Sequence, residues 1–82
     1  MKRISFSDDA KSDIRIIPQH IAMNILASIH RLAEDGSGDV KLLRNSAGEK
    51  RLRLGDYRVR FTEQADGALR IHSVKHRKDA YR

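Results

Sequence analysis

Apolar residues recur at helical spacing in the first half of the chain. Ile4-Ser5-Phe6 alternates like a short strand, and Ser7 follows it as a good helix N-cap. A first helix is expected from about Asp8 to Ile16. A second is expected from Pro18 to Glu34, because proline breaks one helix and suits the first turn of the next. One apolar stripe along the second helix supports it, made of Ile21, Ala22, Ile25, Leu26, Ile29, Leu32 and Ala33.

The rest of the chain has the period of antiparallel strands, after a flexible turn at residues 36–38. Val40 to Leu43 is a weak strand, while Lys50 to Leu54 and Tyr57 to Glu63 flank Gly55-Asp56, a two-residue break typical of a tight hairpin. In that hairpin Leu54 pairs with Tyr57, Arg53 with Arg58, and Arg51 with Arg60.

This register separates the hairpin into two faces. One face carries Leu52, Leu54, Tyr57, Val59 and Phe61, and the other carries Arg51, Arg53, Arg58 and Arg60. A last strand, Ala68 to Lys75, follows the Asp66-Gly67 turn. Leu69 and Ile71 are in phase with each other and Val74 is not, which indicates either a bulge or a strand buried on both faces.

Burial of these faces predicts the fold class. We expect one α+β domain over residues 1–82, with the N-terminal strand and two helices packed on one face of an antiparallel sheet of about four strands. The helices cover the apolar face and leave the arginine face open. Four arginines across one ladder repel each other, so the sequence predicts an anion from outside the domain on that face.

Composition narrows the class of protein. The chain has 82 residues, 39% hydrophobic and 34% charged, which suits one small domain. It has no cysteine, which excludes a disulfide framework and thiol catalysis. No apolar run reaches the roughly 20 residues of a membrane span, and the N-terminus has no signal-peptide core, so the cytoplasm is the expected compartment.

Charge is distributed unevenly. Residues 1–40 hold five basic and six acidic side chains, whereas residues 41–82 hold twelve basic and five acidic ones. The net charge of +6 therefore comes from the C-terminal half. Clustered lysine and arginine bind polyanions by releasing counterions from phosphates, so nucleic acid is the favoured partner over a merely soluble basic surface.

The candidate chemistry lies in the arginine face and the tail from Lys75 to Arg82. A guanidinium group binds phosphate oxygens through two parallel hydrogen bonds, and Tyr81 adds a ring that can stack on a base. His76 is a possible acid or base, or a merely exposed histidine. His72 and His76 lie about 13 Å apart on an extended strand, too far to share a metal ion, so no metal site and no cofactor is expected.

Two motifs carry a resemblance over essentially the whole chain. The stretches from Arg51 to Val59 (RLRLGDYRV) and from Val74 to Arg82 (VKHRKDAYR) are similar to the RelE/ParE toxin superfamily of bacterial type II toxin–antitoxin systems. The RelE branch implies a metal-independent endoribonuclease that cuts mRNA in the ribosomal A site. There the ribose 2′-OH attacks the adjacent phosphate and a 5′-OH leaves.

The resemblance also implies roles for single residues. Arg58 and Arg77 match arginines that neutralise the phosphorane, and Tyr81 matches a C-terminal tyrosine that stacks or assists proton transfer. Glu49 stands where better-known RelE proteins have a lysine, so the general base stays open between Glu49, His76, Tyr81 and the ribosome. The expected RNA-binding residues are Arg51, Arg53, Arg60, His76 and Lys78.

Three functions remain open. The favoured one is a ribosome-dependent mRNA endonuclease (an mRNA interferase), because a gyrase binder does not need Arg58, Arg77 and Tyr81 together. The alternatives are a ParE-type, non-enzymatic inhibitor of DNA gyrase and a plain RNA- or ribosome-binding module. The resemblance implies a cognate antitoxin as partner, with operator DNA bound only through the antitoxin complex and no membrane partner.

Overall fold

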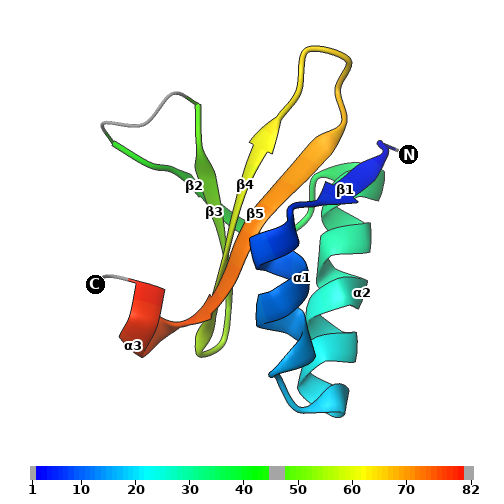
Figure 1. The fold of residues 1–82 in the computed structure, drawn as a ribbon. Coiled ribbons are helices and arrows are strands. Elements are labelled where there is room, and N and C mark those ends of the chain that lie inside the picture. The colour runs from blue at the N-terminus through cyan, green and yellow to red at the C-terminus, as the bar shows by residue number, and fades with distance from the viewer. Residues whose placement is uncertain (1, 45–47, 81–82) are drawn as a thin grey trace.

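A computed structural model describes residues 2–44 and 48–80, and only the backbone of Ala80. Its elements are β1 (Ile4–Phe6), α1 (Asp8–Arg15), α2 (Gln19–Asp35), β2 (Asp39–Leu42), β3 (Lys50–Leu54), β4 (Tyr57–Glu63), β5 (Leu69–His76) and α3 (Arg77–Ala80). Figure 1 shows α1 and α2 side by side against one face of the sheet, with α3 at the far end of β5. The predicted helices and strands are confirmed, with end points that differ by one residue or less at most positions.

The sheet has five strands in the order β1-β5-β4-β3-β2. Four of them are antiparallel, as predicted, and β1 adds to the edge in parallel with β5, where Ile4 is opposite Leu69. The α+β class is therefore confirmed, but the sheet is mixed and has one strand more than expected. The N-terminal strand is part of the sheet itself because its backbone pairs with the otherwise open edge of β5.

The β3–β4 hairpin has the predicted register, with Leu54 opposite Tyr57, Arg53 opposite Arg58 and Arg51 opposite Arg60. Between β4 and β5, Arg60 is opposite Ser73 while Phe61 is opposite Ile71. His72 is thus the extra residue of a bulge, and the bulge returns Val74 to the buried face. Of the two explanations left open by the sequence, the bulge is the one found.

The core lies between α2 and the apolar face of the sheet. Leu52, Val59 and Ile71 are fully buried on the sheet and meet Ile25 and Ile29 of α2. Leu54 and Tyr57 are partly buried at its margin. Within the described residues, β2 is exposed along its whole length and α2 does not cover it, so Leu42 keeps 60% of its surface.

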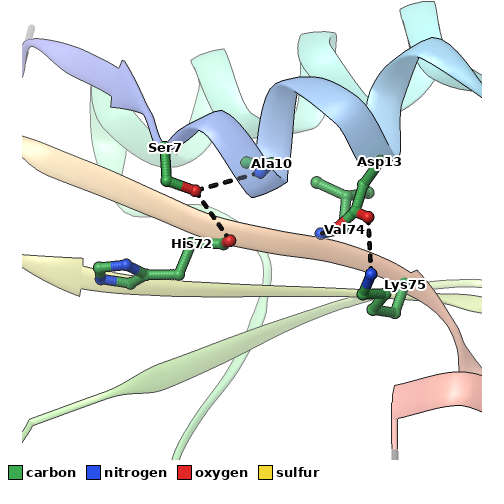
Figure 2. Close-up of polar contacts among 6 residues, drawn as sticks. All are labelled: Ser7, Ala10, Asp13, His72, Val74 and Lys75. Carbon is green, nitrogen blue, oxygen red and sulfur yellow. Dashed lines mark hydrogen bonds and ion pairs between the residues drawn. The ribbon is translucent and has the colours of Figure 1, made fainter.

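The first helix secures the edge of β5 where β1 ends, as Figure 2 shows. The Ser7 hydroxyl accepts a hydrogen bond from the Ala10 amide (3.1 Å), which confirms the predicted N-cap, and donates one to the His72 carbonyl (2.9 Å). The buried Asp13 carboxylate accepts hydrogen bonds from the Val74 amide (3.0 Å) and the Lys75 ammonium (2.6 Å). These contacts satisfy the His72 carbonyl and the Val74 amide, which lie on the edge of β5 beyond the end of β1. They also fix the segment of β5 that leads into α3.

None of the helices in the described residues is long and apolar enough to cross a bilayer.

Candidate functional site: a basic sheet face and a hairpin turn

The face of the sheet opposite α1 and α2 carries the predicted arginine ladder. Arg51 and Arg60 form one cross-strand pair, and Arg53 and Arg58 form the next, so all four lie on the same face. The strands on either side extend it, because Lys41 of β2 is opposite Arg51 and Lys75 of β5 is opposite Arg58.

Two carboxylates of the chain itself neutralise part of this face. Asp39 of β2 is in register with Arg53, and its Oδ2 lies 2.8 Å from Arg53 Nε. Glu49 Oε1 lies 3.8 Å from Arg60 Nε. The expectation that the counter-charge must come from outside the domain is therefore wrong for these two arginines, because β2 and the residue before β3 bring acidic groups to the ladder.

Arg58 and Arg77 both contact the β3–β4 turn. The Arg58 guanidinium folds back onto the turn, and its Nη1 donates to the carbonyls of Gly55 (2.7 Å) and Tyr57 (2.9 Å). Its Nε is buried and has no hydrogen-bond partner among the described residues. The Arg77 amide donates to the Asp56 carbonyl (2.6 Å), and Arg77 Nε lies 3.7 Å from Asp56 Oδ1. Two arginines far apart in sequence thus contact one two-residue turn.

His76 lies apart from the arginine ladder. It is opposite Tyr57 in the β4–β5 ladder, which places it on the helix-covered face, and the two rings meet edge to face with centroids 5.4 Å apart. Its Nδ1 accepts a hydrogen bond from the Lys78 amide at 3.2 Å, which assigns the proton of the neutral ring to Nε2. The Lys78 side chain is exposed in α3. Tyr81 lies outside the described residues.

The sequence pattern assigned no role in the site to three polar residues that make contacts in the structure. Arg70 and His72 join the basic face, since Arg70 is opposite Thr62 and the His72 Nε2 lies 2.8 Å from the Thr62 hydroxyl. Asp13 raises the pKa of Lys75 through its hydrogen bond to the ammonium group. The position of the bulge would have revealed Arg70 and His72, because it fixes which residues of β5 face outward.

The residues that the structure describes contain no group of three or more His, Cys, Asp or Glu side chains placed to hold a metal ion. The guanidinium groups of the site donate up to five hydrogen bonds each and stay charged at any working pH. Such groups bind phosphate and stabilise negative charge that develops on it.

Solved structures share this fold. The RelB–RelE antitoxin–toxin complex of Methanococcus jannaschii is similar with a TM-score of 0.79 and 25% identity over 94% of both chains. The RelBE2 toxin–antitoxin complex of Mycobacterium tuberculosis gives a TM-score of 0.80 and 23% identity over 92% of this chain and 96% of that one. YafQ of Escherichia coli gives 0.74 and 15% over the full length of both.

No curated protein sequence matches the chain significantly. The family model described as the ParE toxin of the type II toxin–antitoxin system parDE matches residues 4–81. The resemblance to the RelE/ParE toxins is thereby confirmed by sequence family and by fold together. The chain belongs to the ParE toxin family of type II toxin–antitoxin systems.

Proposed function

We propose that this toxin is an mRNA endonuclease that acts on the ribosome and inhibits translation. The observation that carries the proposal is the pair of guanidinium groups, Arg58 and Arg77, held at one hairpin turn beside a ladder of further arginines. Guanidinium groups gathered in this way suit the binding of phosphate. The ribosomal target implies that the toxin acts in the cytoplasm.

The proposed reaction is cleavage by the RNA's own ribose. The 2′-OH attacks the adjacent phosphorus as it loses its proton, the bond from phosphorus to O5′ breaks, and the leaving oxygen takes up a proton to become a 5′-OH. Arg58 and Arg77 neutralise the charge that grows on the phosphorane. Tyr81 stacks on a base or assists proton transfer. The RNA backbone is bound by Arg51, Arg53, Arg60 and Lys78, whereas His76, expected from the sequence to join them, lies on the other face of the sheet and is left out of this surface.

The general base is the open part of this scheme. Glu49 is already engaged by Arg60 at 3.8 Å, and His76 lies on the other face of the sheet from the ladder. Tyr81 and the ribosome therefore remain the stronger sources of activation for the 2′-OH. Guanidinium groups cannot serve, because they do not give up a proton at working pH.

The proposed partners are mRNA in the ribosomal A site and a cognate antitoxin. The antitoxin is supported by two structural relatives, from M. jannaschii and M. tuberculosis, that were solved as toxin–antitoxin complexes. Operator DNA is expected to contact this chain only through the antitoxin complex. Because an antitoxin must silence the toxin, it is expected to cover or distort the arginine site.

A second candidate is non-enzymatic inhibition of DNA gyrase, which the ParE description of the matching family favours. Primer extension on mRNA from cells that express the toxin separates the two. Cuts within translated frames support the nuclease. Intact mRNA together with a DNA-damage response supports gyrase inhibition and overturns the nuclease proposal.

A further inference from the structure

The β3–β4 turn holds the two arginines of the proposed phosphate site in different ways. It contacts Arg58 through main-chain carbonyls alone, those of Gly55 and Tyr57. It contacts Arg77 through the main chain and through one side chain, because the Asp56 carbonyl accepts the Arg77 amide and the Asp56 carboxylate lies 3.7 Å from Arg77 Nε. A change of the Asp56 side chain would therefore affect Arg77 and spare the contacts of Arg58.

We propose that Asp56 is a positioning residue that aims the Arg77 guanidinium at the scissile phosphate. This inference rests on the proposed function. The carboxylate engages the Nε edge of the guanidinium, which leaves the two terminal nitrogens available for phosphate oxygens. Arg77 begins a four-residue helix at the end of β5, and its long side chain is 60% exposed. Such a side chain samples many rotamers unless a partner restricts it.

A carboxylate beside a phosphate site has an electrostatic disadvantage, since it repels the RNA backbone. The Asp56 side chain is 64% exposed, so water and salt screen this repulsion and its ion pair alike. The benefit lies in orientation: a guanidinium that is already aimed stabilises the transition state more than the bound ground state. Loss of Asp56 should therefore lower kcat more than it changes KM.

The test compares Asp56→Ala and Asp56→Asn with Asp66→Ala in cleavage of mRNA on programmed ribosomes. Asp66 is the matched control, because it also lies in a hairpin turn and pairs with an arginine, Arg3, at the opposite end of β4. For Asp56→Ala we expect kcat to fall about 10- to 100-fold while KM changes less than about threefold. Asp56→Asn keeps an acceptor oxygen and should fall between Asp56→Ala and the unchanged protein, whereas Asp66→Ala should cut normally.

A second measurement follows the side chain itself. Nitrogen relaxation of the Arg77 Nε–H group in the free toxin should report more motion in Asp56→Ala than in the unchanged protein. A kcat within about twofold of the unchanged protein, or unchanged Arg77 motion, overturns the inference. Tighter RNA binding with unaltered kcat also overturns it, because Asp56 would then only compete with phosphate. If the unchanged toxin does not cut mRNA at all, the proposed function fails, and the relaxation measurement still decides whether Asp56 orders Arg77.

Discussion

At the scale of single residues, the two central arginines differ in how much of their capacity the fold already uses. The Arg58 guanidinium is tied to two carbonyls by one nitrogen while its Nε is buried without a hydrogen-bond partner among the described residues. Arg77 is 60% exposed, and its Nε lies 3.7 Å from the Asp56 carboxylate. The fold thus fixes Arg58 through the main chain and Arg77 through one exposed ion pair, and we expect loss of either guanidinium to harm function more than stability.

We predict that Arg58→Ala or Arg77→Ala abolishes growth arrest without unfolding the toxin. Loss of one charge-stabilising donor typically costs about 10²–10³ in rate. Cleavage on ribosomes and thermal melting of the purified variants measure the two effects separately. Arg3→Ala is the charge-matched control, because Arg3 is 78% exposed and pairs with Asp66 away from the site. Full toxicity of a soluble Arg58→Ala variant at low expression would contradict the assignment.

Tyr81 is proposed to stack on an RNA base, which is worth roughly 1–3 kcal/mol. We predict that deletion of residues 80–82 lowers ribosomal cleavage at least tenfold with little change in melting temperature. The described side chains before them, Lys78 and Asp79, are exposed and contribute little to the core. Tyr81→Phe then separates the two roles: stacking predicts near-normal cleavage, and proton transfer predicts a loss as deep as that of Tyr81→Ala. A truncated toxin that cuts normally leaves Tyr81 without a role.

Lys75 supplies a pH-dependent contribution to stability. The hydrogen bond to Asp13 raises the pKa of Lys75 above its ordinary value. A raised folded-state pKa means that the contribution is complete below the unfolded pKa, about 10.4, and disappears as the pH rises through the folded value. We therefore expect the melting temperature of the unchanged toxin to fall more steeply above pH 10 than that of Lys75→Met, which keeps the apolar stem. If the melting temperatures of the two proteins fall equally with pH above pH 10, the ion pair contributes nothing to stability.

At the scale of elements, the sequence predicts what short-range chemistry determines. The hairpin register followed from a two-residue turn, and the α2 boundaries followed from Pro18 and Gly36. The parallel pairing of β1 with β5 did not follow, because Ile4 and Leu69 are partners across most of the chain and no local pattern encodes that contact. The Asp39–Arg53 ion pair was missed for the same reason, since it depends on the register of a weak edge strand.

The loop from α2 to β2 depends on one glycine in particular. Gly38 has a φ of +133°, and a Cβ at this position would lie 2.6 Å from Cδ1 of the fully buried Leu52. We predict that Gly38→Ala lowers the free energy of unfolding by about 2–4 kcal/mol, from backbone strain and displacement of Leu52. Gly36→Ala is the control, with a positive φ of +78° and open space around the added methyl, and should cost about 1 kcal/mol.

Urea unfolding of the two variants measures this difference directly. Equal losses for Gly38→Ala and Gly36→Ala would mean that Leu52 moves aside without cost and that the contact with β3 is not a packing constraint.

At the scale of the whole molecule, the two faces of the sheet differ in character. The helix-covered face contains the core, and the opposite face collects cations from four strands, β2 to β5. The predicted segregation of apolar and basic residues is thus confirmed, and the net charge of +6 gives the molecule an attraction to polyanions that added salt weakens. Attraction of this kind does not choose a cleavage site, so under the proposed nuclease function the selectivity comes from how the RNA is presented.

This division predicts that cleavage depends on the ribosome. The arginine pair at the β3–β4 turn can stabilise a phosphorane but cannot take the proton from a 2′-OH. The substrate must therefore arrive with its 2′-OH already in line with the breaking bond, a geometry that free RNA rarely adopts and that a bound A-site codon can hold. We expect rapid cutting of mRNA on programmed ribosomes and at least a hundredfold slower cutting of the same RNA alone, measured as single-turnover rates. The toxin is expected to bind free RNA even where it does not cut it. The affinity of the toxin for free RNA, measured in parallel, therefore separates failure to bind from failure to react. Equal rates on free and ribosome-bound RNA would instead place a complete acid–base system within this chain.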